Sequence, residues 1–170
     1  MGVERVNPEA LVFVKVTNSW FDPMGEAEAA HTLIASGCDV IAQHCDSITS
    51  QVEANKAGVW GIGYNTDMSI EVPDAVLTSV LWHWGAYYIA LVQSVIDGSF
   101  TTEPWFGSLK DGMVDIAPLN EKINWPEETV LLLERERGRI EGGAFDVFDL
   151  SDEEIRNKIN RYYQNVALIK

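Results

Sequence analysis

Long hydrophobic runs and basic charge are both scarce in this chain of 170 residues. No apolar run reaches the roughly 18 residues that a membrane-spanning helix needs. The chain has 12 lysines and arginines against 26 aspartates and glutamates, which gives a net charge of -14. Without a basic cluster, this charge makes nucleic acids and anionic membranes poor partners. The 46% apolar content is nevertheless that of an ordinary folded domain.

Cysteine is also rare, since only Cys38 and Cys45 occur. They flank an apolar run that, as an extended segment, would hold their Cα atoms too far apart for a disulfide. No second Cys or His pair completes a tetrahedral metal site. We therefore predict two free, buried thiols and no metal.

Sequence signatures of catalysis are missing as well. The chain has no G-x-S-x-G elbow, no H-E-x-x-H motif and no phosphate-loop pattern. His31, His44 and His83 form no evident triad with a nucleophile, and a surplus of carboxylates is normally a solvated face. We predict a protein that is not an enzyme and uses no cofactor.

The first residues, "MGVERVNPEA", lack the basic end and apolar middle of a secretory signal. We therefore expect a cytoplasmic location if Met1 is the natural start.

Strand and helix patterns alternate through the first half of the chain. Two successive strand–helix–strand units imply right-handed crossovers and a parallel sheet. Asp22 can cap the first helix, Pro23 suits its first turn and Gly37 can end it. The pattern predicts strands at 11–16, 39–43 and 59–64, and helices at 23–36 and 48–57.

The second half begins with residues 75–98, which start like a strand and continue as a helix that is apolar on most of its circumference. Such a helix should be covered on more than one side. No repeat or linker divides the chain, so we predict a single α/β domain over 1–170. Further elements are expected as strands at 113–119 and 144–150, a helix at 126–140, and a final helix that begins at Ser151.

Three loops follow the predicted parallel strands, at 18–22, 44–47 and 65–69. Ligands bind at the carboxyl ends of such strands, because the loops gather there. An aromatic ring beside short polar side chains suits a small, flat, hydrogen-bonding ligand. The loops supply Trp20, Phe21, Asp22, His44, Asp46, Ser47, Asn65 and Asp67.

Each of these residues also has a purely structural interpretation. Trp20 could close the edge of the sheet, and Asp22, just before Pro23, is better explained as a helix cap. His44 could be a hydrogen-bonded structural histidine, while Asn65 and Asp67 could simply form turns.

Several ordered blocks of the chain carry a family resemblance. These are "SWFDPMGEAEAAHTLIASGCDVIAQHCDS", "AGVWGIGYNTDM", "LTSVLWHWGAYYIALVQSVIDGSF" and "FGSLKDGMVDIAPL". From about residue 10 to the end, the chain resembles the carboxy-terminal half of the basic membrane protein family. Its members are substrate-binding proteins of ABC transporters, similar to bacterial purine nucleoside receptor lipoproteins.

The resemblance implies one lobe of a type I periplasmic-binding-protein fold, a parallel sheet flanked by helices, which closes with a second lobe on a purine base or nucleoside. It places Trp20 where the family stacks an aromatic ring on the base. Asn65 stands where nucleoside-binding relatives carry Asp, and Trp82 where many carry Lys, so a free base such as adenine is the better guess. The ligand-binding candidates are Trp20, Asp22, Asp46, Asn65, Asp67 and Trp82.

The resemblance also implies that the amino-terminal lobe and the lipidated cysteine of the family are missing. The helix at about 82–97 would cross the hinge and pack in that lobe, so its apolar faces need other cover. We therefore expect a homo-oligomer, possible contact with an ABC transporter permease, and weakened purine affinity. Alternatives are an oligomeric interaction or regulatory protein that keeps the lobe without transport, and, least favoured, an enzyme that acts between subunits.

Overall fold

The computed structural model describes residues 2–143, 153 and 157. Its centre is a four-stranded sheet in the order β1-β2-β3-β4. The strands are β1 (Val40–Ala42), β2 (Trp60–Asn65), β3 (Val76–Trp82) and β4 (Val114–Ile116). The first three are parallel, and β4 runs antiparallel to β3. The predicted α/β class with a mostly parallel sheet is confirmed.

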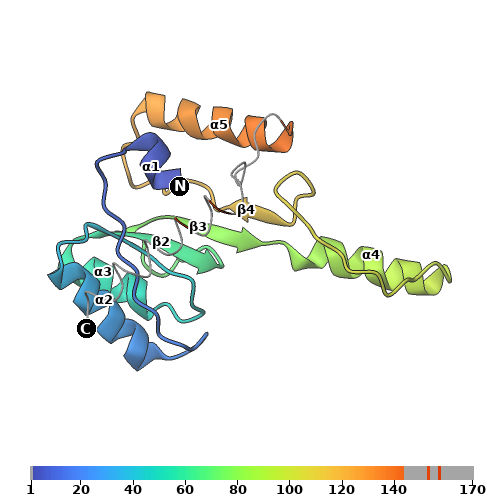
Figure 1. Cartoon of the computed structure of the whole chain (residues 1–170), viewed down its shortest axis with the longest axis horizontal. Coiled ribbons are helices and arrows are strands. Elements are labelled where there is room, and N and C mark those ends of the chain that lie inside the picture. Colours follow the sequence, from blue (N-terminus) through green and yellow to red (C-terminus); the bar gives the residue numbers. More distant parts are fainter. Residues whose placement is uncertain (1, 144–152, 154–156, 158–170) are drawn as a thin grey trace.

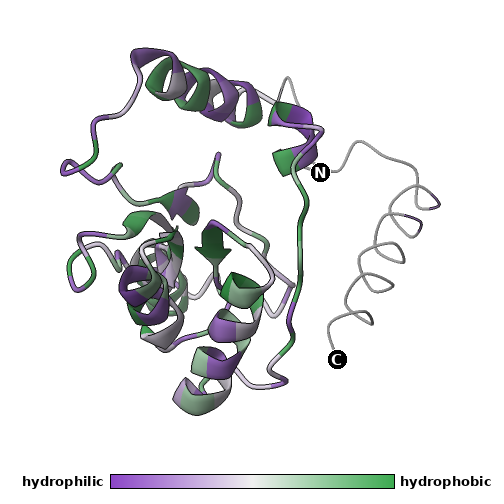
Figure 2. Cartoon of the chain, turned by 90° about the vertical axis from the view of Figure 1, so that its left-hand side faces the viewer, coloured by the Kyte–Doolittle hydropathy of each residue, from purple (hydrophilic) through white to green (hydrophobic). Residues whose placement is uncertain are grey.

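The helices lie on both sides of this sheet (Figure 1). α2 and α3 pack on each other, and both contact β1. Figures 1 and 2 place α5 on the opposite side of the sheet. The helix bounds are α1 (Gly2–Val6), α2 (Pro23–Ala35), α3 (Thr49–Ala57), α4 (Trp84–Ile96) and α5 (Glu127–Glu141).

Helix α2 begins and ends where local chemistry dictates. The Asp22 carboxylate accepts a hydrogen bond from the Gly25 N–H at 3.1 Å, and Pro23 occupies the first turn. Gly37 has a φ of 92°, a left-handed conformation that suits glycine after a helix. The predicted cap at Asp22 and the helix end are confirmed.

The buried core lies between β3 and the segment that leads into it. Met68, Val72, Ala75 and Val76 form one cluster, and Ile48 and Val52 pack against it. Beside it, Gln51 is fully buried, and its amide Nε2 donates to the Ile62 carbonyl at 3.1 Å. Gly61 faces this amide so closely that a Cβ there would collide with Gln51 Oε1.

Two regions differ from the sequence prediction. Residues 11–16 form no strand, because no backbone hydrogen bond joins them to another described segment. Cys38 and Cys45 are free, as predicted, but they are only partly buried because both lie in loops around β1. The predicted strand at 144–150 and most of the final helix lie outside the described residues.

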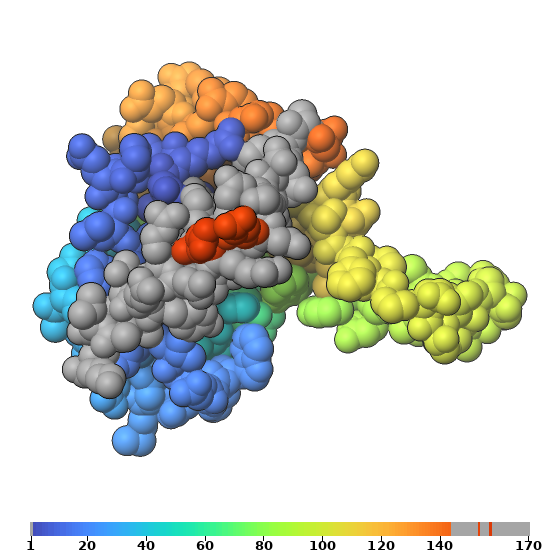
Figure 3. Space-filling model, in the orientation of Figure 1, coloured from blue at the N-terminus to red at the C-terminus, as the bar shows by residue number. Residues whose placement is uncertain are grey.

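Helix α4 stands away from the body of the molecule (Figure 3). It contains no buried residue, although it is mostly apolar. Ile89 and Ile96 are 74% and 72% exposed. The cover that its composition predicts is therefore absent from the part of the chain that the structure describes.

Candidate functional site at the carboxyl ends of the strands

The parallel pairing of β1, β2 and β3 brings their carboxyl ends to one edge of the sheet. The loop that precedes α2 joins this edge through a hydrogen bond from the Asp46 N–H to the Trp20 carbonyl, at 2.7 Å. The structure therefore brings together the loops at 18–22, 44–47 and 65–69, which sequence analysis selected.

Four rings line this edge, one from each successive loop or strand end. The ring centroids of Trp20 and His44 are 5.3 Å apart, and those of His44 and Tyr64 are 4.5 Å apart. The Tyr64 and Trp82 centroids follow at 6.1 Å. All three contacts are edge-on, which is a favourable geometry for neighbouring aromatic rings. We call Trp20, His44, Tyr64 and Trp82 the aromatic row.

Trp20 is open to solvent, with 61% of its surface exposed. Its indole meets His44 at 90°, so these two rings do not stack face to face. Tyr64 and Trp82 are half-buried at the ends of β2 and β3. A flat molecule can therefore reach Trp20 without displacing any packed side chain.

The row continues beyond the sheet into α4. The Trp82 and Trp84 centroids lie 6.4 Å apart, and Trp84 stacks on Tyr88 at 5.9 Å. Tyr87 stacks on Trp105 at 4.3 Å. Trp82 ends β3 and Trp84 begins α4, and this change from strand to helix lets the two rings meet.

The acidic candidates differ in how much of their hydrogen-bonding capacity is free. Asp22 uses one carboxylate oxygen to cap α2, and Asp67 Oδ1 accepts from the Ser69 N–H and Oγ at 3.1 and 2.7 Å. The Asp46 side chain is exposed and makes no hydrogen bond within the described residues. Asn65 is exposed too and holds a φ of 73°, so it also shapes the turn after β2.

A buried carboxylate connects two of these loops by hydrogen bonds. Glu26 is only 1% exposed, and its Oε2 accepts a hydrogen bond from the Ser47 hydroxyl at 2.6 Å. Its Oε1 accepts from the Asp22 N–H at 3.1 Å. Glu26 thus ties the loop before α2 to the loop after β1, which fixes the spacing of Trp20 and His44.

Of the aromatic row, sequence analysis named Trp20 and Trp82 as ligand-binding candidates, but not Tyr64 or His44. Tyr64 was treated only as part of a strand, and His44 only as a loop residue with a structural alternative. The available signal was their place near a strand end, since Tyr64 lies one residue before the end of β2 and His44 two residues after the end of β1. Glu26 was missed because its partner, Ser47, lies on another element.

Ionisable groups elsewhere in the molecule show shifts with simple causes. Burial, helped by the neighbouring Asp39 charge, raises the pKa of the Cys38 thiol. Hydrogen bonds from Lys56 and His31 lower the pKa of Glu53. Within the described residues, no group of three His, Cys, Asp or Glu side chains could hold a metal ion. The described helices also include none with the length and apolar character to cross a membrane.

Comparison with known proteins gives the chain its relatives. A purine-binding protein of Brucella abortus is 38% identical over 148 residues, which are 87% of this chain and 41% of that protein. A Haloferax volcanii protein named as an ABC transporter glucose-binding protein is 40% identical over 113 residues, which are 66% of this chain and 29% of that protein. The chain thus spans less than half the length of these relatives.

Solved structures share the fold at low sequence identity. A Bacillus halodurans protein titled as a transcriptional activator of the comK gene matches with a TM-score of 0.73 and 20% identity, over 81% of this chain and 48% of that one. A solute-binding protein of Aeropyrum pernix matches with a TM-score of 0.70 and 15% identity, over 98% of this chain and 56% of that one.

The family of PnrA-like substrate-binding proteins of ABC transporters matches residues 1–140, which include every strand of the sheet and nearly all of α5. This match covers most of the chain and agrees with the Brucella relative and with the fold. The chain therefore belongs to the PnrA-like family of ABC transporter substrate-binding proteins.

Proposed function

We propose that this chain binds a purine base at the carboxyl edge of its sheet, as the substrate-binding lobe of a purine transport receptor. The observation that carries the proposal is the open indole of Trp20 at one end of the aromatic row. Stacking of one base on an aromatic ring contributes about 1–3 kcal/mol to binding. The purine-binding relative in Brucella abortus supports the same ligand class.

Polar groups near Trp20 would give the site its selectivity. Asp46 offers an uncommitted carboxylate, and Asn65 offers an exposed amide that can donate to and accept from a base. Asp67 keeps only its second oxygen available, because Oδ1 already bonds Ser69. We assign Asp22 a capping role first, since its hydrogen bond to Gly25 holds α2 in place.

A free base fits this set better than a nucleoside. The resemblance puts Asn65 where nucleoside-binding relatives use an aspartate for the ribose hydroxyls, and an amide accepts fewer hydrogen bonds than a carboxylate. Trp82 replaces a lysine with an apolar ring, which favours a flat ligand over a charged or highly hydroxylated one. Glucose, the ligand class in the name of the Haloferax relative, is the alternative that a binding test must include.

A titration monitored by calorimetry and Trp fluorescence tests this function. The ligands are adenine, guanine, adenosine, inosine and glucose. Trp20→Ala should weaken adenine binding by about 5- to 150-fold, the factor that matches the loss of one stacked base. Trp60→Ala is the matched control, because Trp60 is also exposed but begins β2 at the opposite edge. Absence of binding at millimolar purine, or equal loss in both variants, contradicts the proposal.

We further propose that α4 pairs with a second copy of the chain or with the permease of the transporter. The exposed apolar residues of α4, such as Ile89, Val92 and Ile96, form a surface of the kind that marks an interaction site. A second chain could also supply the other wall of the purine site. Light scattering at micromolar concentration should give a mass above that of one chain, and Ile89→Ser should reduce it; a single-chain mass excludes self-association.

An oligomeric interaction protein without transport remains the second candidate, and the unburied α4 favours it. It predicts a stable oligomer together with no response to any purine in the same titration. The two measurements therefore separate the two functions.

A further inference from the structure

Gln43 directly follows β1 and leads into the loop at 44–47, one of the loops of the candidate site. Its side-chain amide turns back toward this loop. Nε2 donates to the Cys45 carbonyl and to the Ser47 carbonyl, each at 2.7 Å. A side-chain amide has two N–H groups, so the whole donor capacity of Gln43 is used within the loop that follows it.

A second amide, that of Gln51 on α3, fixes the orientation of the Gln43 amide. Gln51 is 0% exposed, and its Nε2 donates to Gln43 Oε1 at 2.9 Å and to the Ile62 carbonyl at 3.1 Å. Exchange of the oxygen and nitrogen of Gln43 would set its oxygen against the Cys45 and Ser47 carbonyls, which would repel it. Gln43 is therefore held with its donor toward the loop.

The Gln51 amide keeps this arrangement although its own oxygen is unpaired. Gln51 Oε1 is buried and accepts no hydrogen bond within the described part of the chain. A buried acceptor without a partner destabilises a fold, so each such group needs an explanation. Turning this amide over would remove the hydrogen bond that orients Gln43. The unpaired oxygen therefore indicates that this hydrogen bond has a use other than stability.

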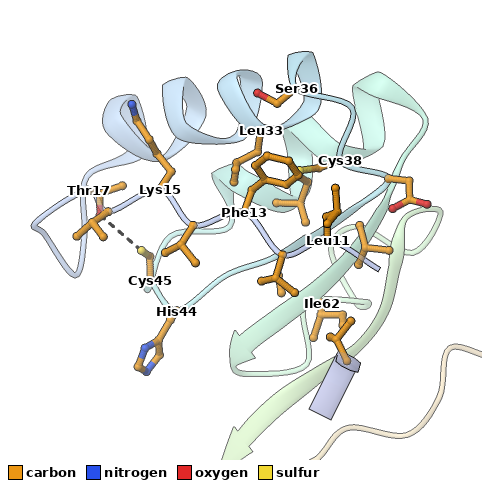
Figure 4. A pocket seen from close by; sticks show the side chains of 18 of the residues that line it. Leu11, Phe13, Lys15, Thr17, Leu33, Ser36, Cys38, His44, Cys45 and Ile62 are labelled. Atoms are coloured by element: carbon orange, nitrogen blue, oxygen red, sulfur yellow. Dashed lines mark hydrogen bonds between the residues drawn. The ribbon is translucent and has the colours of Figure 1, made fainter. Parts of the chain in front are cut away.

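The other side of the loop borders open space. A cavity of about 1260 Å³ lies beside β1, and Cys45 lines it (Figure 4). On this side Thr17 Oγ1 lies 3.7 Å from Cys45 Sγ, which is a weak contact. The restraint on the loop therefore comes mainly from its inner side, where Gln43 and the Ser47–Glu26 hydrogen bond hold it.

The loop in turn contacts Trp20, the ring on which we place the purine. The Asp46 N–H donates to the Trp20 carbonyl at 2.7 Å, and the centroids of the His44 and Trp20 rings are 5.3 Å apart. Both contacts depend on the path of residues 44–47. If the loop took several paths, only a fraction of the molecules would be ready to bind, and the apparent affinity would fall by that fraction.

We propose that Gln43 is a positioning residue of the purine site: its amide, oriented by Gln51, holds the loop at 44–47 in the shape that binds the ligand. This inference rests on the proposed function. Gln43 acts through the loop and not by contact with the ligand. Because the restraint acts before binding, its loss should slow ligand association more than it speeds dissociation.

The test compares two side-chain amides that make the same pair of hydrogen bonds at opposite ends of the sheet. Asn120 Nδ2 donates to the Pro73 and Val76 carbonyls, each at 2.7 Å, near the start of β3. Gln43→Glu and Asn120→Asp each replace the donating nitrogen with an oxygen. Both should lower the melting temperature, because two carbonyls lose their donor. Only Gln43→Glu should weaken adenine binding, by about tenfold or more.

Rate constants from stopped-flow Trp fluorescence separate positioning from ligand contact. Gln43→Glu should lower the association rate constant of adenine and leave the dissociation rate constant nearly unchanged. Without ligand, the Asp46 amide should exchange faster in this variant, because its hydrogen bond to Trp20 opens more often. Gln43→Met, which removes the donor without adding a charge, should show the same pattern and replaces Gln43→Glu if that variant does not fold.

Several results would overturn the proposal. These are an unchanged adenine affinity in both Gln43 variants, an equal loss of affinity in Asn120→Asp, and a loss that lies wholly in the dissociation rate constant. Failure of the proposed function is a different result, because the original chain then binds no purine. In that case Asp46 exchange that is equally slow in Gln43→Glu still contradicts the role of Gln43 in holding the loop.

Discussion

Helices α2 and α4 each have 13 residues, yet α2 buries side chains and α4 buries none among the described residues. α2 is interrupted by glutamates and a histidine, but it packs on α3 and buries Glu26, Ala29 and Ala30. α4 is almost wholly apolar and buries nothing in the described chain. Burial therefore depends on whether a partner surface lies within reach, and not on the hydrophobicity of the helix alone.

Truncation of a buried core side chain, compared with truncation of a side chain on α4, should show this contrast most strongly. Met68 is 3% exposed, so Met68→Ala leaves a cavity and should lower the free energy of unfolding by about 2–5 kcal/mol. Ile89→Ala on α4 removes a side chain that is 74% exposed in the single chain, so it should change the free energy of unfolding by less than about 0.5 kcal/mol at concentrations too low for self-association. Urea unfolding of both variants measures the difference. A comparable loss in both would mean that α4 is covered in solution.

Glycine offers a second test of the same contrast. A methyl group at Gly61 would collide with Gln51 Oε1, so Gly61→Ala should destabilise the chain by about 1–3 kcal/mol. Gly85→Ala on α4 meets no atom within 4 Å and should be neutral or slightly stabilising. Thermal unfolding compares them. The double variant Gly61→Ala, Gln51→Ala should recover part of the loss if the clash is the cause.

Loss of the residue before each helix should also destabilise α2 more than α4, with a smaller change in the free energy of unfolding. Asp22 caps α2, whereas His83, at the same position of α4, makes no side-chain cap. Asp22→Ala should cost about 0.5–2 kcal/mol, while Asp22→Asn and His83→Ala should cost little. Denaturant unfolding gives the values. If Asp22→Asn keeps stability but abolishes adenine binding, Asp22 contacts the ligand as well as the helix.

The smallest effect concerns the two ion pairs of Glu53, one with His31 on α2 and one with Lys56 on α3 itself. Glu53 lies 2.6 Å from His31 and 2.7 Å from Lys56, and these hydrogen bonds lower its pKa below the ordinary value of 4.5. A lowered pKa in the folded state stabilises the fold above pH 4.5, and this gain is lost as the pH falls through the folded value.

The melting temperatures of the original chain and Glu53→Gln should therefore differ slightly at pH 7 and converge as the pH falls below the folded-state pKa of Glu53. Because the partners His31 and Lys56 are exposed, added salt should also reduce this difference in melting temperature. A difference that grows on acidification would contradict the assignment.

The site shows how far local sequence signals reach. Asp22 before Pro23 and Gly37 after the helix predicted the bounds of α2, and the strand ends predicted which loops would meet. Trp20 was selected because it is an aromatic residue in one of these loops and because the resemblance places a stacking ring there. Glu26 and Trp105 could not be selected in this way, because their roles depend on partners from other elements.

The sequence alone determined the alternation of strands and helices from residue 23 onward, the parallel pairing of β1 with β2 and the loops at their carboxyl ends, because these follow from periodicity, caps and right-handed crossovers. Only the tertiary structure decided that residues 11–16 stay unpaired, that α4 remains uncovered and that a cavity lies beside β1. The physical reason is that a strand or an apolar helix needs a second surface for its hydrogen bonds or its burial, and no property of the segment itself supplies that surface.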